Sequence, residues 1–214
     1  HKTVRRQRQM CIRDRGIPAP TSAASTSITS GTDDGTQTQY STSYVYTFVS
    51  AFGEEGPPSP ASTVLTKVDG QTVTISGMDT ATSKSNTNLA NKRIYRSNTG
   101  SNTTNFQFVK EVSLATASTT DNLNNDALAE IIPSTYWIAP PDDDTSTYPN
   151  GQMLGLTAMA NGIFAGFSGK RICFSEPFLP HAWPVAYRIT LEEEIVSIAM
   201  AGQVLFIATK GTPY

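Results

Sequence analysis

The stretch Tyr44-Val45-Tyr46-Thr47-Phe48-Val49-Ser50-Ala51 decides the fold class of this chain. It is rich in aromatic and β-branched residues, which fit the pleated surface of a sheet. Alternation along a strand places its aromatic side chains on one face and its valines on the other. The run then breaks at residues 53–60, where three prolines cannot donate hydrogen bonds to a central ladder. The pattern predicts a β-strand followed by a loop that leads to a sheet edge.

Further short strands are predicted on the C-terminal side of this run. Clusters of Asn, Gly, Ser and Asp separate them, and these residues favour turns. One stretch, residues 122–132, is also compatible with a single helical turn before Pro133. Several short strands at this spacing predict an antiparallel β-sandwich over residues 39–136. The predicted strands are residues 62–66, Thr72–Ser76, 93–96, 106–112 and 117–120.

Composition supports an all-β chain and excludes several other classes. The chain has 214 residues, of which 38% are hydrophobic and 16% are charged, whereas about 25% are charged in an average soluble domain. No run of about 18 apolar residues is present, so no membrane span is predicted. Heptad repeats, collagen triplets and a disulfide framework are absent from the sequence as well.

The first fifteen residues, HKTVRRQRQMCIRDR, differ in composition from the rest. The segment holds six of the 16 basic residues and one of the 18 acidic ones. It could be a basic arm for nucleic acid or a transit-type segment. The string RQRQMCIRDR also resembles translated sequencing-adapter sequence fused to metagenomic reading frames, and we interpret residues 1–15 as an artefact of that kind. We further expect the reading frame to be open at both ends.

Exclusion of this segment changes the charge balance. Residues 16–214 carry 10 basic residues against 17 acidic ones, a formal net charge of −7. This balance argues against specific nucleic-acid binding. Cys173 is then the remaining cysteine, so an internal disulfide is not possible. The cysteine content therefore does not indicate whether the protein works in an oxidising or a reducing compartment.

Two segments have the composition of linkers. Residues 16–38 are rich in small polar residues, Pro and Gly and have no apolar period, which predicts a disordered linker. Residues 137–152 contain consecutive prolines and turn residues, which predict a second linker. The acidic run 142–144 in it lacks the spacing of a calcium loop, so a solvated turn is the preferred interpretation.

The region from Met153 onward contains a repeat. Ala158-Met159-Ala160 and Ala199-Met200-Ala201 each precede an apolar strand-like run, and the two copies are offset by 41 to 42 residues. Paired hairpin strands with a period near 40 are typical of β-propeller blades. We therefore predict the first hairpins of a truncated propeller over residues 153–214, with a generic hairpin pair as the alternative.

Candidate catalytic groups are few. His181 is the only histidine outside residues 1–15, and its sequence neighbours Ser175 and Glu176 could in principle form a triad with it. No nucleophile-elbow motif is present, and one histidine with one cysteine does not predict a zinc site. We interpret His181 as a surface or packing residue and Cys173 as a small core residue. No catalytic residue, metal site or cofactor is predicted.

Paired carboxylates for glycoside cleavage are a further possibility. Glu54 and Glu55 lie beside Gly and Pro in a predicted loop, and the run 192–194 precedes a strand. Adjacent acids in sequence more often form a solvated face, which is the preferred interpretation here.

Residues 176–187, EPFLPHAWPVAY, carry the candidate binding residues Phe178, Trp183 and Tyr187. Exposed aromatic rings at these positions could stack on a sugar or a base. The net acidity of the chain disfavours a base, which leaves glycan contact. A packed proline–aromatic corner is the other interpretation, and we favour it.

Two stretches resemble known families. Residues 44–60 resemble the last two strands of fibronectin type III modules, where an aromatic strand ends in a Gly-Glu turn and a Ser-Pro strand. Residues 93–97 and 106–112 resemble the central strands of that module. The closing strands come first in this chain, which implies a broken module or a rearranged sandwich.

The second stretch is residues 169–184, GKRICFSEPFLPHAWP, together with the hairpin 195–211. It resembles structural proteins of tailed bacteriophages, of the tail or head–tail connector kind. The resemblance implies a non-enzymatic virion protein that forms homo-oligomers and contacts other virion proteins. The alternative is a secreted or cell-surface bacterial protein with a carbohydrate-binding or glycan-cleaving β domain.

Overall fold

The computed structural model describes residues 16–82, 87–99, 104–142, 145–146 and 148–214. The chain is all-β with antiparallel sheets, as the sequence predicts. It divides into two compact units. The first, which we call the sandwich unit, is Pro18–Thr135. The second, the hairpin unit, comprises Tyr136–Tyr214 together with Gly16 and Ile17.

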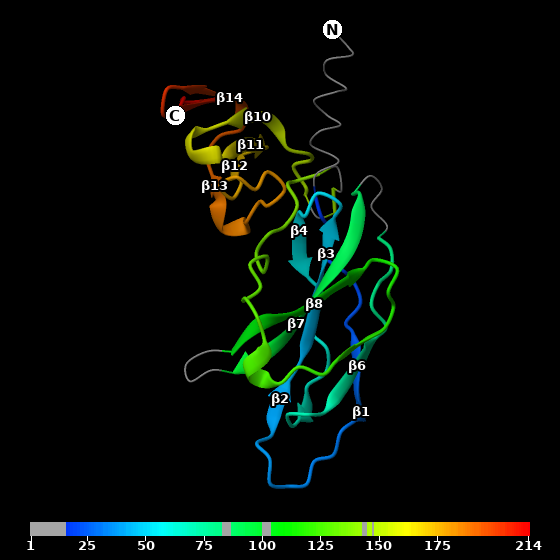
Figure 1. The fold of residues 1–214 in the computed structure, drawn as a ribbon. Helices are drawn as coiled ribbons and strands as arrows, with labels where there is room; N and C mark the ends of the chain where they lie inside the picture. The colour runs from blue at the N-terminus through cyan, green and yellow to red at the C-terminus, as the bar shows by residue number, and fades with distance from the viewer. Residues whose placement is uncertain (1–15, 83–86, 100–103, 143–144, 147) are drawn as a thin grey trace. The chain divides into compact units, whose positions relative to one another are not determined.

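Two main sheets build the sandwich unit (Figure 1). One has the strand order β1-β6-β9 and the other has the order β4-β3-β7-β8, and a short pair joins β2 to β5. A single 3-10 turn, η1 (Asn125–Ala127), lies in the stretch for which a helical turn was considered. The strands are β1 (Ser25–Ser30), β2 (Tyr40–Thr42), β3 (Tyr44–Ser50), β4 (Glu55–Pro58), β5 (Leu65–Lys67), β6 (Thr72–Ser76), β7 (Leu89–Thr99), β8 (Thr104–Ser113) and β9 (Thr119–Asp121).

The predicted strands agree with the structure except near the N-terminus. The run 44–51 forms β3, as predicted, whereas the stretch predicted as a loop contains a short edge strand, β4, with two prolines. The linker interpretation of residues 16–38 does not hold for Ser25–Ser30, which form β1 and pair with β6. Most side chains of β1 stay exposed, so its strand state depends on backbone pairing and not on an apolar period.

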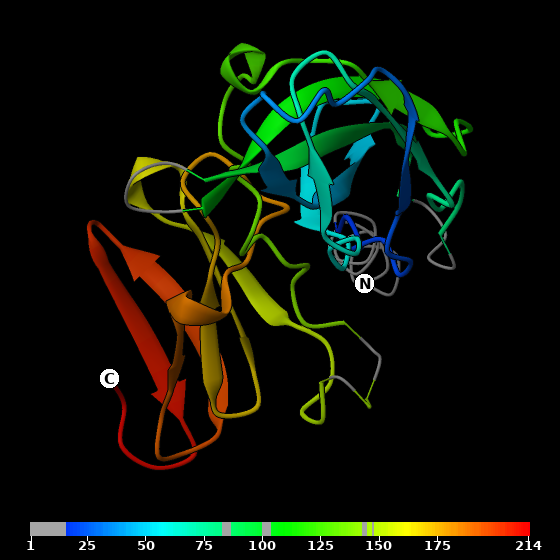
Figure 2. The same cartoon turned by 90° about the horizontal axis from the view of Figure 1, so that it is seen from below.

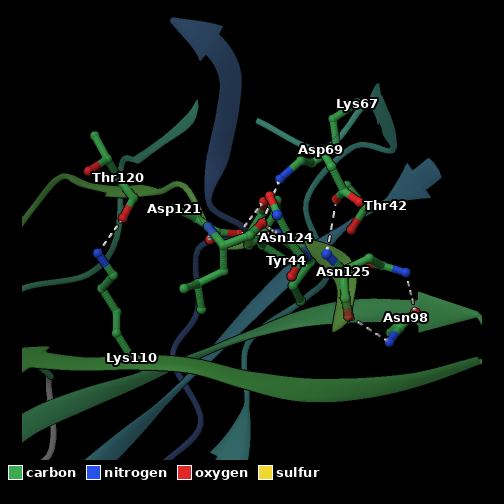
Figure 3. Close-up of polar contacts among 12 residues, drawn as sticks. Thr42, Tyr44, Lys67, Asp69, Asn98, Lys110, Thr120, Asp121, Asn124 and Asn125 are labelled. Carbon is green, nitrogen blue, oxygen red and sulfur yellow. Dashed lines mark hydrogen bonds and ion pairs between the residues drawn. The ribbon is translucent and has the colours of Figure 1, made fainter. Parts of the chain in front are cut away.

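The two sheets of the sandwich are joined by a buried ion pair. Arg96 of β7 donates from Nη1 to Oδ2 of Asp121 on β9 at 2.6 Å, and both side chains are almost fully buried. The hydroxyl of Tyr44 on β3 donates to the same carboxylate oxygen at 2.8 Å. Figure 3 shows the polar groups that surround this carboxylate. An ion pair buried to this degree is tolerated only when further hydrogen bonds compensate for the lost water.

Backbone carbonyls provide part of that compensation, although the buried Nε of Arg96 has no hydrogen-bond partner among the described residues. Arg96 also donates to the carbonyl oxygens of Leu123 and Asn124, and the Nζ of Lys67 donates to the Leu123 carbonyl at 3.0 Å. Asn124 and Asn125 are held in turn by Gly70 and Asp69. Polar contacts therefore fix the loop after β9 to the loop that follows β5.

A second polar contact lies further along β7. Lys92 is fully buried, and its Nζ donates to the carbonyl oxygens of Asp79 and Thr116. The same ammonium lies 5.9 Å from the centroid of the Tyr46 ring, a cation–π distance. The Tyr46 hydroxyl donates to the Ser22 carbonyl and accepts from the Asp79 amide. Lys92 and the two Nη groups of Arg96 thus exchange water for protein oxygens.

The other face of the four-stranded sheet is also covered. Residues 129–132 pair with the edge of β8 through Phe106 and Phe108, and Ile132 packs on Val45. Glu55 is buried here and accepts from Thr47, Tyr95 and Ser134. It also pairs with Arg93 at 3.0 Å. The interpretation of Glu54 and Glu55 as a solvated face is therefore wrong for Glu55, because β4 turns its side chain towards this covered face.

The hairpin unit contains a four-stranded antiparallel sheet in sequential order, β10-β11-β12-β13, and a separate hairpin, β14–β15. Figure 2 shows this hairpin alongside the strands of the sheet, and β14 lies against β10 and β11. The elements are β10 (Leu154–Ala158), η2 (Ala160–Gly162), β11 (Phe164–Ser168), β12 (Arg171–Phe174), η3 (Val185–Tyr187), β13 (Arg188–Thr190), β14 (Ile195–Ala201) and β15 (Val204–Thr209).

Both copies of the predicted repeat form hairpins, β10–β11 and β14–β15. The core between them consists of Ala165, Phe167 and Ile172 from the sheet and Ile195 and Ile198 from the hairpin. In the stretch 137–152, predicted as a linker, two described residues are bonded to this unit: Trp183 donates its amide to the Ile138 carbonyl, and Met153 donates to that of Pro141. Whether further blades complete a propeller stays a prediction.

Replacement of Asp121 by Ala is expected to destabilise the chain by about 3–5 kcal/mol, because it leaves the Arg96 guanidinium buried without its counter-charge. Glu111, whose ion pair with Arg93 is one-third exposed, is the matched control. Glu111→Ala should cost no more than about 1 kcal/mol. Urea unfolding of the whole chain, followed by amide protection in β3 and β7, measures both values. Equal costs for the two variants would contradict this account.

Burial raises the pKa of Tyr46 to about 12, and it also raises the pKa of Tyr44 and Tyr95. The folded state therefore favours the neutral phenols. This contribution to stability is complete below pH of about 10, the ordinary tyrosine pKa, and is lost as the pH rises towards the folded-state values. Unfolding free energies measured across this range should fall with rising pH. Tyr46→Phe should weaken that dependence, whereas Tyr136→Phe, at an exposed position, should not.

Candidate functional site

The candidate binding residues lie in the loop between β12 and β13. Backbone hydrogen bonds fold residues 175–183 onto themselves: Leu179 donates to Glu176, Ala182 to Leu179, and Glu176 to Ala182. The Ser175 amide donates to the Phe164 carbonyl, which ties the loop to β11. The prolines of the sequence EPFLPHAWP limit its freedom further. The loop is therefore an ordered corner of the hairpin unit.

Trp183 does not belong to an exposed aromatic surface. Its side chain is buried with Met153 and Cys173, and Phe164 packs against the same cluster. The indole Nε1 donates to the Pro180 carbonyl at 3.0 Å, so its single donor is satisfied inside the corner. The prediction that Trp183 is a surface binding residue is wrong, and the packed proline–aromatic corner describes it correctly. The favourable free energy of burying the large indole ring of Trp183 explains why this ring lies in the core and is not available to stack on a ligand.

Phe178, by contrast, is strongly exposed, at 76%. Its backbone has a φ of +60°, a left-handed conformation that is unusual for a bulky residue. Its amide donates to the Gly162 carbonyl at 2.9 Å, and its ring lies directly over Gly162. Glycine is favoured at position 162 for two reasons. Its φ of +70° is allowed for glycine in the hairpin turn, and the missing side chain leaves space for the Phe178 ring.

Tyr187, in the 3-10 turn η3, is also exposed. Among the described residues, no ring contact joins it to Phe178 or Trp183. One of the three predicted residues thus lies in the core, and no ring contact joins the two exposed ones among the described residues. A continuous stacking platform for a sugar is not formed by them.

Two members of the triad that the sequence allowed, Ser175 and His181, have structural roles in the described loop. The Ser175 hydroxyl donates to the Glu176 carbonyl and accepts from the Phe164 amide, so it is occupied in local structure. His181 is buried with its ring edge-to-face on Trp137, at a centroid distance of 6.0 Å. It is therefore a packing residue, not a surface residue. Cys173 is fully buried, and burial raises the pKa of its thiol, which disfavours a nucleophilic role.

The acidic runs differ from one another. Glu55 is part of the buried network of the sandwich unit, whereas Glu194 pairs with Lys210 at the surface. Asp143 and Asp144 of the acidic run lie outside the described residues, as do residues 1–15. Within the described part of the chain, no group of three or more His, Cys, Asp or Glu side chains is placed to hold a metal ion. No helix there is long and apolar enough to cross a membrane.

The surface features that sequence reasoning missed are apolar. Most large hydrophobic side chains that remain exposed among the described residues belong to the hairpin unit, although the sandwich unit is the larger of the two. In the sandwich unit the exposed ones are Ile28, Phe52, Val64 and Ile131. In the hairpin unit they are Tyr136, Leu154, Leu156, Phe178, Val185, Tyr187, Ile189, Val196, Val204, Phe206 and Tyr214. The alternating pattern of the sequence did not show which face of each strand stays uncovered.

Comparison with known proteins adds no assignment, since no protein-family model and no curated protein matches the chain.

Substitution of Gly162 by Ala is expected to destabilise the hairpin unit more than substitution of Gly202. Both glycines occupy hairpin turns with similar positive φ, so the backbone cost of a Cβ, about 1–2 kcal/mol, is shared. A Cβ at Gly162 would lie 2.4 Å from the Phe178 ring, whereas one at Gly202 meets no atom within 4 Å. Thermal unfolding measures the difference. Addition of Phe178→Ala to Gly162→Ala should remove the excess cost; persistence of that cost would disprove the contact.

Proposed function

We propose that this chain is a non-enzymatic structural and assembly protein of a tailed-bacteriophage particle, of the tail or head–tail connector kind. The observation that carries the proposal is the concentration of exposed apolar side chains on the hairpin unit. Exposed apolar surface of this kind marks sites of protein–protein contact. The resemblance of residues 169–184 to phage structural proteins falls in the same unit, which gives the contact a role in particle assembly.

The sandwich unit suits the same role. Its core contains the ion pair of Arg96 with Asp121 and the buried Lys92, and its four-stranded sheet is covered on both faces. The two stretches that carry the fibronectin resemblance form β3–β4 and β7–β8, which lie side by side in one sheet. This arrangement supports a rearranged fibronectin-like module that acts as a rigid spacer.

The propeller remains part of the proposal for the hairpin unit. The four antiparallel strands β10 to β13 follow one another in sequential order, which is the strand arrangement of one propeller blade. In this proposal, β14–β15 begins a second copy of the blade. The acidic balance of residues 16–214 suits a protein that does not adhere to packaged DNA. The glycan-binding alternative loses support because Trp183 is buried.

Mass spectrometry of purified particles tests this function. Nuclease-resistant particles would be separated by density from cells that express the gene, next to soluble and cell-surface fractions. The tryptic peptide of residues 189–210 should follow the capsid proteins into the particle fraction. Recovery of this peptide only from the secreted or cell-surface fraction would contradict the proposal and favour the bacterial alternative.

A further inference from the structure

The chain passes from one unit to the other twice, and the first crossing follows Ile17. Gly16 and Ile17 belong to the hairpin unit, although the rest of that unit begins only at Tyr136. Both residues are buried, and Ile17 is only 2% exposed. A Cβ at Gly16 would lie 2.6 Å from the Cβ of Ala139. The glycine therefore allows the backbone at residue 16 to lie directly on Ala139.

The residues that follow are bonded to the sandwich unit. The backbone amides of Thr21 and Ser22 donate to one carboxylate oxygen, Oδ2 of Asp79, at 2.7 and 3.1 Å. The Ser22 carbonyl accepts from the Tyr46 hydroxyl at 2.9 Å. Residues 18–20, Pro-Ala-Pro, are therefore all that separates the two docked ends. Three extended residues reach about 10 Å at most, so this crossing is short.

The second crossing is equally short. Ser134 is fully buried in the sandwich unit, and its hydroxyl donates to Glu55 at 3.3 Å. In the hairpin unit, the Ile138 carbonyl accepts from the Trp183 amide at 2.9 Å. Only residues 135–137 lie between these two bonded ends.

We propose that residues 16–22 form a strap, a second short connection that prevents the two units from turning freely about residues 135–137. A single connection leaves the units free to rotate about each backbone bond within it. A second connection closes a ring of chain through both units, and only motions that satisfy both connections remain. The proposal goes beyond the assembly function and does not depend on it, because it concerns the mechanics of the chain.

The residue types of the strap support this role over that of a flexible linker. Flexible linkers are rich in Gly and Ser along their length, whereas proline-rich ones act as semi-rigid spacers. In the strap, the two prolines lie in the span between the docked ends, and each fixes its φ angle. Gly16 lies at the close approach to Ala139, and Ile17 is the one large aliphatic side chain of residues 16–27. That side chain is buried, so the strap is anchored by its only large aliphatic group.

NMR relaxation of the backbone amides in the full chain tests the proposal. Amides in β7 and β11 give the rotational correlation time of each unit separately. In the wild-type chain the two times should be equal, because two short connections make the units tumble together. A flexible insert of about ten Gly and Ser residues between Ala19 and Pro20 lengthens the strap and changes no docked residue. The two times should then separate, and the hairpin unit, which is the smaller one, should tumble faster.

The same insert after Gly35 is the matched control. Gly35 lies in the exposed loop between β1 and β2, inside the sandwich unit, and a Cβ there meets no atom within 4 Å. This insert should leave the two correlation times equal. Amide chemical shifts of β3 and β11 would verify that both units are folded in each variant.

A substitution pair gives a second test if the strap insert prevents folding. Ile17→Asp should release the strap from its buried position and separate the two correlation times. Ala19→Asp, at an exposed position between the prolines, should not. Unequal times in the wild-type chain would overturn the proposal. Equal times after the strap insert, or after Ile17→Asp, would overturn it as well.

Discussion

The ion pair between Arg96 and Asp121 is the contact on which the sandwich unit depends most. It joins a central strand of one sheet to an edge strand of the other, and Tyr44 adds a hydrogen bond to the same carboxylate. Removal of two charges from water costs several kcal/mol per ion, and hydrogen bonds must offset that cost. The carbonyl groups of Leu123 and Asn124 accept from the two Nη groups of Arg96, whereas its buried Nε has no hydrogen-bond partner among the described residues. The loop that follows β9 must therefore have one conformation for the sheets to close.

The need to compensate buried charges with hydrogen bonds or ion pairs also explains how β7 accommodates three basic residues. Lys92 and Arg96 point to the inside of the sandwich, where backbone carbonyls of loops receive them, and Arg93 points to the opposite face and pairs with Glu55. A shift of β7 by one residue would exchange these faces and leave each charge without its partner. Polar contacts in this core thus fix the register of β3 and β7, while Tyr46, Phe48, Val73 and Ile75 provide the apolar burial.

Local sequence patterns predicted the fold class and most strands. They did not predict which candidate site residues are buried and which are exposed. Strand Thr72–Ser76 alternates clearly and was predicted at its observed bounds. Ser25–Ser30 has no such pattern, because its partner β6 alone makes it a strand. Glu55 was assigned to a solvated face by its sequence neighbours, and Trp183 was a candidate for an exposed surface beside the favoured packed corner; tertiary packing buries both. The sequence of β7 holds three basic residues, Lys92, Arg93 and Arg96, but no local pattern shows which of them face the core.

The hairpin unit has the opposite character, with an apolar surface left open where the sandwich unit encloses polar groups. The proposed assembly function assigns protein–protein contact to the apolar surface of the hairpin unit. The central structural claim is that Arg96 is sequestered with Asp121, and NMR of the arginine side chains tests it most directly. The account predicts guanidinium Nη protons of Arg96 that exchange with water far more slowly than those of exposed arginines, with contacts to the Tyr44 ring. Exchange of the Arg96 protons at the rate of exposed arginines would contradict it.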